Sequence, residues 1–574
     1  MRRVKKGGAV RGFRRIATAA LAIVAASALA ACAGLPTSGP VNPGVPADEV
    51  PDAPFLYYPG GPVEGASPEQ ILNGFLEAAT SPASDWATAR EFLTPDFAPD
   101  WEPEAHVTVD VPNSRVVDAE RLEEEGIVEA TLEPVATVDE RGVYRTSDAA
   151  QAELAFEMEQ QADGEWRISR APAGIVLDRD VFEDVYHDYS LYYFDPTWTY
   201  LVPDVRWFPT QSSETRISDE LLRGASEYVS AAALTAFPQG TQLAPGGVVF
   251  DNERIANVTL TQEATSANAD ERSRMRAQLL ASLASLGAQD VHMHAGDIDL
   301  SAETLEPAST RPDARALVVG DTGYDAGFGF LDSGGAIDRI SSLASAAGDT
   351  TSISMSADRT ALVVQDTAGV VWRRTDDGGD VLDARDGLVE PTIDPQGFSW
   401  SVPGDEPQEL AAYTQEYEPV EIPGGIPDAD RVFGVQASPD GTRLAALVAT
   451  ERGNRAVVLP IVRETDGMPV GLGEPVSVTP LTGRGIDIAW LDSSTLGIVS
   501  EDEAGIVIVQ QRVGGPATYL SSEANIVSIA AGSQSTIARL LSENGTLFIR
   551  RGSTWQPAAT GIEVLATQLG APRS

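Results

Sequence analysis

A short turn phrase recurs four times in the C-terminal half of the chain and constrains its fold more than any other feature. It appears as SADRTALVV, DPQGFSW, SPDGTRLAALV and LDSSTLGIV, each with one aspartate in the turn: Asp358, Asp394, Asp440 and Asp492. The aspartates are 36, 46 and 52 residues apart, which averages about the length of one propeller blade. The segment 439–441 (Pro-Asp-Gly) favours a tight turn, and the apolar residues after it are typical of a buried strand. The phrase therefore predicts four-stranded sheets repeated around a ring.

Residues 304–574 are the predicted propeller. At roughly 45 residues a blade, this length gives about five or six blades. A closed ring buries both faces of each sheet and leaves only short edges. A pair of β-sandwiches is the alternative fold, but it would lack the repeated turn phrase.

Residues 65–187 show a different pattern, two helices followed by several strands. The helix in SPEQILNGFLEAA is expected to begin at Ser67 as N-cap, with Pro68 in its first position and an apolar stripe that includes Phe75. A second short helix is expected around 86–93, and antiparallel strands then run to DGEWRISRAP. The order predicts an α+β domain that resembles the NTF2-like domains of exported bacterial proteins.

Residues 188–303 are predicted to form a second α+β domain. Two strands are followed by a helix with Ser218 as N-cap, further strands, and a helix that ends at Gly287 before a last strand. This order, the FPQGTQL turn and the NVTL strand resemble the GerMN domain of germination and sporulation proteins. The sequence LLRGAS departs slightly from that family's usual Leu-Leu-x-Gly-Pro.

The N-terminus has the pattern of an export signal. Seven basic and no acidic residues are followed by an uncharged apolar stretch from Ile16 to Ala31. Leu29, Ala30, Ala31 and Cys32 resemble a lipobox. That resemblance implies that residues 1–31 are removed by cleavage between Ala31 and Cys32. It also implies that the Cys32 sulfur carries a diacylglyceryl group, and it leaves open whether the new N-terminus is acylated as well. An ordinary secretory signal followed by an incidental cysteine is the alternative.

The segment after the signal is rich in proline, glycine and small polar residues. Residues 32–64 are accordingly predicted to be a flexible tether. With Cys32 as the only cysteine, no disulfide can form within the mature chain, so its stability must come from buried cores.

Charge and composition exclude several classes of function. The net charge is −45, and it falls to −52 without residues 1–31. So acidic a chain is repelled by nucleic acid, and we expect none as a partner. Lys5 and Lys6 are the only lysines, so the mature chain has no amine for a Walker A loop or a pyridoxal Schiff base.

Few residues form a recognisable catalytic or metal-binding pattern. The sequence has no Gly-x-Ser-x-Gly elbow and no His-Glu-x-x-His motif. His292 and His294 share one face of a predicted strand and are weak candidates for metal ligands, with Asp297 as a third. The favoured interpretation is a polar strand face whose other side, Val291 and Met293, packs in the core. We expect no cofactor and no metal.

Three further patterns have ordinary structural interpretations. The acidic stretch TDDGGDVLDARDG fails the EF-hand pattern and is expected to be a solvated turn. The run of three glutamates at 123–125 is expected on an exposed face. Nine aromatic residues between 186 and 208 form either domain cores or an interaction surface, and the cores are favoured.

The ordered set of lipobox, NTF2-like segment, GerMN-like segment and C-terminal propeller resembles the LpqB family, lipoproteins of high-GC Gram-positive bacteria. The resemblance covers nearly the whole chain. It implies a non-enzymatic lipoprotein, anchored on the outer face of the cell membrane. It also implies that the protein acts together with the extracellular domain of the Mtr sensor histidine kinase and adjusts signalling that controls envelope homeostasis and cell division.

A second class of function also agrees with the sequence. A surface hydrolase or cell-wall glycan-binding protein would have its site in the propeller channel. Turnover on wall fragments, or a carboxylate with a strongly shifted pKa in the channel, would favour that alternative.

Overall fold

Three regions of different sheet topology follow one another in the computed structural model. It describes residues 59–568 with short gaps, and the predicted signal (1–31) and Cys32 lie outside the described residues. The gaps are residues 210–213, 312, 322, 324–325, 333, 341–342, 344–349, 523, 533–537 and 553.

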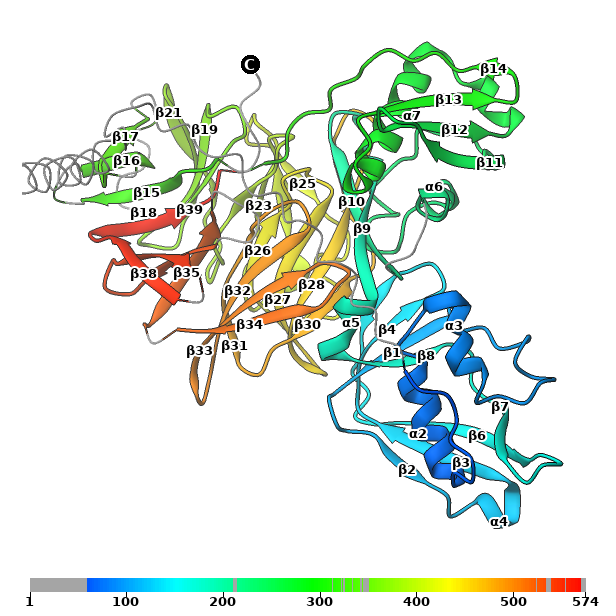
Figure 1. Ribbon diagram of the computed structural model, residues 1–574. Coiled ribbons are helices and arrows are strands. Elements are labelled where there is room, and N and C mark those ends of the chain that lie inside the picture. Colours follow the sequence, from blue (N-terminus) through cyan, green and yellow to red (C-terminus); the bar gives the residue numbers. More distant parts are fainter. Residues whose placement is uncertain are drawn as a thin grey trace, which may run out of the picture. The chain divides into compact units, whose positions relative to one another are not determined.

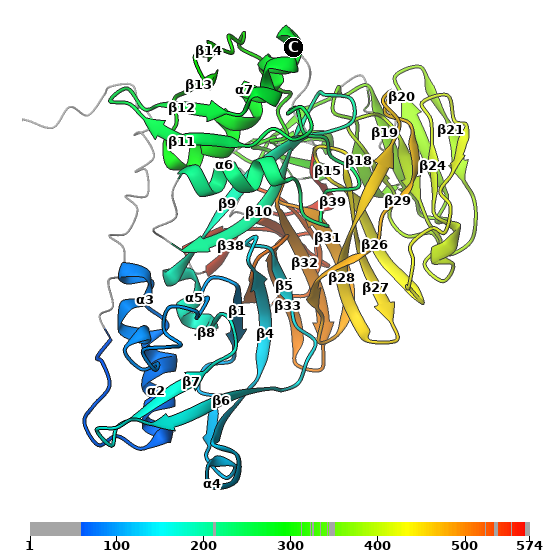
Figure 2. The same ribbon diagram turned by 90° about the vertical axis from the view of Figure 1, so that its right-hand side faces the viewer.

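The first region is an α+β domain of two four-stranded sheets. Helix α2 (Pro68–Ala78) begins at the predicted cap, where the Ser67 side chain accepts a hydrogen bond from the backbone N–H of Gln70. Its apolar stripe is buried and the helix packs against the sheet β2-β3-β6-β7 (Figure 2). The second sheet has the order β5-β4-β1-β8, and β1 pairs with β8 in parallel although antiparallel strands alone are expected from the sequence.

The elements of this domain are α2, α3 (Ala83–Arg90), β1 (His106–Asp110), β2 (Val116–Asp118), α4 (Leu122–Glu125), β3 (Ile127–Leu132), β4 (Pro134–Asp139), β5 (Tyr144–Thr146), β6 (Ala152–Gln160), β7 (Trp166–Arg170), β8 (Ile175–Asp178) and α5 (Arg179–Val185).

The second region begins with a long hairpin and continues as a four-stranded sheet with a crossover helix. Strands β9 (Tyr186–Phe194) and β10 (Leu201–Pro209) pair antiparallel along their whole length. Helix α7 (Ala269–Leu283) joins the parallel strands β12 and β13 and packs through Met275 and Leu279 into the same core as Val258. The remaining elements are α6 (Glu214–Arg223), β11 (Leu243–Phe250), β12 (Ile255–Leu260), β13 (Asp290–Ala295) and β14 (Ile298–Asp299).

The predicted cap at Ser218 is wrong. Helix α6 already includes Glu214, so Ser218 lies inside the helix, is buried, and its Oγ has no hydrogen-bond partner among the described residues. The sequence SDEL resembles a cap because serine is followed by acidic residues, but the helical pattern extends one turn further toward the N-terminus.

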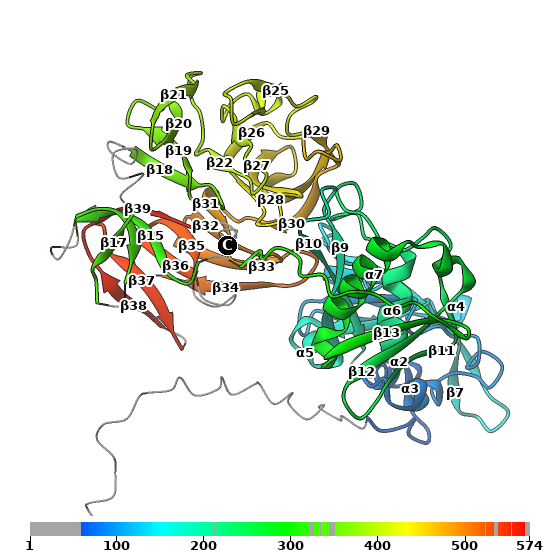
Figure 3. The same cartoon turned by 90° about the horizontal axis from the view of Figure 1, so that it is seen from above.

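The third region is a propeller of six four-stranded sheets among the described residues, one of which also carries the extra strand β30. Its innermost strands contact one another in the closed order β39, β18, β22, β26, β31, β35 and back to β39. Figure 3 shows these sheets arranged around a common centre. In Figure 1 the C-terminal strand β39 (red) lies beside β15 (green), and the two pair antiparallel, so the last strand completes the first blade. The predicted fold class, two α+β domains followed by a propeller, is confirmed.

The propeller strands, blade by blade, are β39 (Ile562–Ala566), β15 (Ala316–Asp321), β16 (Ala326–Leu331) and β17 (Ile337–Arg339); β18 (Thr350–Met355), β19 (Ala361–Asp366), β20 (Val371–Thr375) and β21 (Gly378–Asp383); β22 (Thr392–Ile393), β23 (Ser399–Ser401), β24 (Ala411–Tyr413) and β25 (Pro419–Glu421); β26 (Arg431–Ala437), β27 (Arg443–Thr450), β28 (Gly453–Arg463), β29 (Pro469–Leu472) and β30 (Val476–Pro480); β31 (Arg484–Trp490), β32 (Thr495–Asp502), β33 (Gly505–Arg512) and β34 (Ala517–Ser521); β35 (Ile526–Ala531), β36 (Ala538–Ser542), β37 (Leu547–Arg551) and β38 (Thr554–Ala559).

The repeated phrase is the turn between the first and second strands of four blades. The aspartate side chain closes the turn by accepting hydrogen bonds within it. Asp440 Oδ1 accepts from Ser438 Oγ (2.7 Å) and from the backbone N–H of Thr442 (3.0 Å). Asp440 Oδ2 also forms a buried ion pair with Arg443 at 2.5 Å. The aspartate recurs because it accepts the hydrogen bonds that close this turn in each of the four blades.

Asp358→Ala is expected to lower the free energy of unfolding by about 1 kcal/mol, because Asp358 Oδ1 accepts from Ser356 Oγ (2.7 Å) and from Thr360 N (3.1 Å) at the surface. Urea unfolding followed by circular dichroism measures this. Asp377→Ala, in the exposed hairpin turn between β20 and β21, is the matched control and should change stability by less than about 0.5 kcal/mol. Equal effects of the two substitutions would contradict the role given to the phrase.

Candidate functional site

The residues singled out from the sequence do not come together in one site. Cys32 and the lipobox residues Leu29, Ala30 and Ala31 lie outside the described residues, so lipidation stays a prediction. On β13, Val291 and Met293 are buried, as expected for a core-facing side. His292 is exposed, and His294 Nδ1 lies 3.9 Å from Asp299 Oδ1. Within the part of the chain that is described, no three His, Cys, Asp or Glu side chains are placed to hold a metal ion.

The acidic stretch 375–387 is only in part the solvated turn expected from the sequence. Asp376 and Asp377 form an exposed turn and Asp380 is exposed on β21, but Asp383 at the end of that strand is buried and paired with Arg385 at 2.6 Å. The glutamates at 123–125 belong to the short helix α4, which has no buried residue.

Most of the aromatic residues between 186 and 208 pack in domain cores, and the hairpin β9–β10 that carries most of them joins all three regions. Trp207 packs in the core of the first domain, with its ring centroid 4.9 Å from that of Phe182. Tyr193 packs in the core of the second domain, and Val202 packs in a core shared with the propeller. We call this hairpin, residues 186–209, the strut.

Hydrogen bonds and ion pairs extend these contacts. Trp207 Nε1 donates to the backbone oxygen of Gly514 in the propeller at 2.7 Å. Tyr228 donates to the backbone oxygen of Tyr144 at 2.9 Å, which joins the second domain to the first. Arg455 of the propeller pairs with Asp148 of the first domain at 3.1 Å.

A buried ion pair lies on the strut itself. Asp204 Oδ2 and Arg206 Nη2 are 2.7 Å apart, and both side chains are fully buried. Asp204 also accepts hydrogen bonds from the backbone N–H (2.8 Å) and the hydroxyl (2.5 Å) of Ser226. Burial alone would lower the pKa of Arg206, but the Asp204 carboxylate raises it above its ordinary value. The polar atoms of the pair are therefore well supplied with partners although both side chains are buried.

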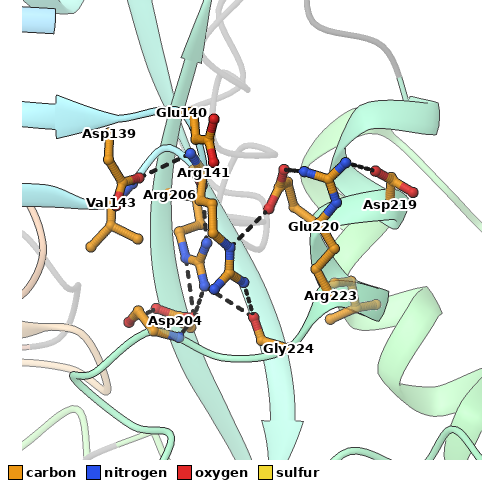
Figure 4. A network of polar contacts seen from close by, with 12 residues as sticks. Asp139, Glu140, Arg141, Val143, Asp204, Arg206, Asp219, Glu220, Arg223 and Gly224 are labelled. Carbon is orange, nitrogen blue, oxygen red and sulfur yellow. Dashed lines mark hydrogen bonds and ion pairs between the residues drawn. The ribbon is translucent and has the colours of Figure 1, made fainter. Parts of the chain in front are cut away.

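The same pair connects the first two domains (Figure 4). Arg206 donates to the backbone oxygen of Arg141 at 2.9 Å, in the turn between β4 and β5. Arg141 in turn donates to the backbone oxygen of Gly224 (2.5 Å), just after α6, and contacts the Glu220 carboxylate of that helix at 3.4 Å. One signal in the sequence could have found this network: two opposite charges at i and i+2 within the otherwise apolar strand VPDVRWF.

The propeller channel contains a second group of charges that sequence reasoning missed. A cavity of about 250 Å³ lies between the innermost strands and is lined by Glu390, Asp487 and Glu563, among others. Glu390 lies two residues before the first strand of its blade, while Asp487 and Glu563 lie on the first strands of two other blades. No sequence pattern links these three positions, because ring closure alone brings them together.

Two of these carboxyl groups, those of Glu390 and Asp487, have raised pKa values. Burial raises the pKa of Glu390 to about 8, and the negative charge of Asp487 contributes to the shift. Burial also raises the pKa of Asp487 to about 6, although its carboxylate accepts hydrogen bonds from the backbone N–H of Ile529 (2.8 Å) and Ile488 (2.7 Å). The side chain of Glu390 is exposed to solvent within the channel. The two groups therefore titrate as a pair at a pH higher than usual.

The pH dependence of the free energy of unfolding should show this titration. Between the ordinary glutamate pKa of about 4.3 and the raised value, folded Glu390 keeps a proton that the unfolded chain has lost. The free energy of unfolding therefore falls with rising pH over this interval. We expect the urea midpoint of the wild type to fall relative to that of Glu390→Gln as the pH rises from 5 to 8. Glu421→Gln, on the outer strand β25, should run parallel to the wild type, and parallel curves for Glu390→Gln would contradict the shift.

Comparisons with known proteins match these three regions in order. Residues 61–183 match the family model described as "Lipoprotein LpqB, N-terminal domain", residues 190–296 match "Sporulation and spore germination", and residues 332–565 match "Lipoprotein LpqB beta-propeller domain". The described residues include no helix long and apolar enough to cross a membrane.

Individual relatives align with almost the whole length of this chain. Lipoprotein LpqB of Bifidobacterium longum is 24% identical over 97% of this chain and 99% of its own, and that of Streptomyces avermitilis is 27% identical over 96% and 98%. Among solved structures, TolB of Acinetobacter baumannii matches with a TM-score of 0.33 and 11% identity, over 44% of this chain and 65% of its own. The chain belongs to the LpqB family of lipoproteins.

Proposed function

We propose that this lipoprotein is an accessory regulator of an Mtr-type sensor histidine kinase, which it contacts on the outer face of the cell membrane and through which it influences envelope homeostasis and cell division. The proposal rests on family membership over nearly the whole chain. Acyl chains on Cys32 would hold the protein near the membrane, and residues 32–64 would let it reach a neighbouring ectodomain.

The strut is the structural observation that supports this proposal best. A regulator that acts by docking must hold its surfaces in a fixed relation, so that a contact made by one domain affects the others. The strut contributes side chains to the cores of both α+β domains and to the core shared with the propeller. The buried Asp204–Arg206 pair adds a polar connection whose disruption is costly.

In-cell photo-crosslinking tests the proposal and locates the contact. Three exposed apolar residues, one in each region, offer positions for a crosslinking side chain: Val116, Val249 and Tyr519. Mass spectrometry should identify the ectodomain of a sensor kinase captured from at least one position. Capture of wall-synthesis enzymes alone, or of nothing reproducible from any position, would contradict the proposal.

Cys32→Ala, expressed behind an ordinary cleavable secretory signal, is expected to move the protein from the membrane fraction to the soluble fraction. The reason is that each buried methylene of an acyl chain contributes about 0.8 kcal/mol to membrane binding. Immunoblots of fractions washed with carbonate measure the distribution. The wild-type chain behind its own signal is the control, and a variant that stays in the washed membrane would refute anchoring through Cys32.

The channel carboxyl groups favour a second candidate function, a hydrolase or glycan-binding protein with its site in the channel. Glycoside hydrolysis uses a pair of carboxyl groups, of which one has a raised pKa. The cavity of about 250 Å³ is, however, below the usual range of roughly 300–1,000 Å³ for small-molecule sites. Turnover of wall fragments by the wild type, lost in Glu390→Gln, would establish this function; no turnover above a blank would exclude it.

A further inference from the structure

A buried arginine of the propeller lacks a direct counter-charge. Arg373 on β20 is 5% exposed, and its Nη1 donates to the backbone oxygen of Gly397 (3.1 Å) and to Ser399 Oγ (2.9 Å) in the next blade. Both acceptors are uncharged, and no ion pair joins Arg373 to a carboxylate of the described residues. By contrast, the buried Arg463 pairs with Asp394. A buried guanidinium without such a partner is unfavourable unless an anion meets it.

The two other nitrogens of this guanidinium face a cavity. Nε and Nη2 of Arg373 have no hydrogen-bond partner among the described residues, and both keep some accessible surface, unlike the fully buried Nε of Arg443. Arg373 lines a cavity of about 300 Å³, and because protein surrounds the rest of the residue, the two nitrogens are accessible from this cavity. Nε and Nη2 form the edge with which an arginine grips a carboxylate, as Arg115 does with Asp110 at 2.7 and 2.8 Å.

The cavity lies between the turn of the strut and the turns of three successive blades. The residues that these turns contribute are Thr197, Thr199, Ser356, Gln415 and Asp466. A Cβ at Gly397 would collide with Nε2 of Gln415, so this amide lies beside the glycine whose backbone oxygen accepts from Arg373. The Gln415 side chain has no hydrogen-bond partner among the described residues. Its amide is therefore a third donor beside the guanidinium.

Three aspartates limit the charge that a ligand of this cavity can carry. Asp358, Asp394 and Asp466 also line it. Arg463 pairs with Asp394, while the other two carboxylates are exposed. A group with two negative charges, such as a phosphate, would be repelled by them. A carboxylate has one negative charge and needs only the two donors of Arg373, so the cavity favours a single carboxylate group.

We propose that this cavity binds the carboxylate group of a small organic acid or of a peptide C-terminus, held by Nε and Nη2 of Arg373 and by the amide of Gln415. A cavity of about 150 Å³ is large enough to hold benzene, so one of about 300 Å³ has room for a carboxylate and several further atoms. The ligand would contact the strut at Thr197 as well as the propeller. This site is independent of the proposed contact with a sensor kinase.

Methyl NMR of the purified full-length protein, labelled on alanine and threonine, tests the proposal. N-acetylglycine and the peptide acetyl-Gly-Ala-Ala are the carboxylate probes, and acetyl-Gly-Ala-Ala amide is the neutral match. Ala357 and Thr197 line the cavity, and their methyl signals report binding. At millimolar concentration, at least one carboxylate probe should shift both signals saturably, and the amide should shift neither.

Substitutions of the proposed donors separate charge from geometry. Arg373→Gln should weaken binding at least tenfold, because it removes the charge and the two-donor edge. Arg373→Lys keeps the charge but not that edge and should weaken binding at least threefold, and Gln415→Ala should weaken it several-fold. Arg374→Gln is the matched control and should bind as the wild type does. Arg374 follows on the opposite face of β20, lies over the ring of Trp372 (5.4 Å to its centroid) and does not line the cavity.

Several results would overturn the proposal. These are no saturable shift with either carboxylate probe, equal shifts with the amide, tighter binding of inorganic phosphate than of both carboxylates, or unchanged affinity in Arg373→Gln. If that variant does not fold, Arg373→Lys gives the same comparison. The two probes also distinguish the source, since preference for N-acetylglycine indicates a small organic acid and preference for the peptide indicates a chain terminus.

Discussion

Asp204→Ala is expected to lower the free energy of unfolding by about 3–5 kcal/mol, the largest effect of any single polar substitution proposed for this chain. The substitution leaves the Arg206 guanidinium fully buried without its carboxylate. It also removes the acceptor of both hydrogen bonds from Ser226. Urea unfolding should give a midpoint well below that of the wild type. Hydrogen exchange should show faster exchange in α6 and in the β4–β5 turn, which the same network connects.

Two further variants distinguish the loss of this buried ion pair from the loss of a carboxylate in general. Asp219→Ala removes a partly exposed carboxylate that pairs with Arg223 at 3.1 Å, and it should cost less than about 1 kcal/mol. The double variant Asp204→Leu with Arg206→Met should recover much of the loss, because it removes the unpaired buried charge. An Asp204→Ala protein as stable as Asp219→Ala would show that the pair does not hold the strut in place.

Trp207→Ala is the second substitution with a large expected effect, about 3–5 kcal/mol. The indole packs in the first domain against Phe182 and Tyr144, and its Nε1 donates to Gly514 in the propeller. Its loss therefore leaves a cavity in one region and an unpaired backbone oxygen in another. Calorimetry should show a lower Tm, and hydrogen exchange should rise both in the core of the first domain and around residue 514.

The matched control for that substitution is Trp555→Ala, on the outer strand β38 of the last blade. Trp555 is partly exposed, so its replacement should cost no more than about 1.5 kcal/mol and affect only its own blade. If hydrogen exchange in Trp207→Ala becomes faster only around residue 207, with no change near residue 514, the bridging role of this side chain is contradicted.

Much of the fold could be predicted because its signals are local. The turn aspartates are visible in the sequence since each closes a turn within a few residues of itself, as Asp440 does with Ser438 and Thr442. The cap at Ser67 is also local, and it is confirmed. The cap at Ser218 is wrong because a serine followed by acidic residues occurs inside a helix as well as at its start.

The candidate sites depend on contacts that are distant in sequence and were therefore missed. Asp204 and Arg206 are neighbours on one strand, but their importance follows from Arg141 and Ser226, which other elements bring to them. Glu390 and Asp487 lie two blades apart and line one cavity only because the ring closes. A charged residue inside an apolar strand, as in GIDIAW, is the one signal that could have pointed to Asp487.

Direct binding to the kinase ectodomain is the measurement that tests the central claim. The full-length lipoprotein, purified and placed in lipid nanodiscs, would be titrated with the purified ectodomain of the sensor kinase and followed by biolayer interferometry. The account predicts saturable binding, weakened at least fivefold by Trp207→Ala and unchanged by Trp555→Ala. The absence of saturable binding by the wild-type protein would contradict it.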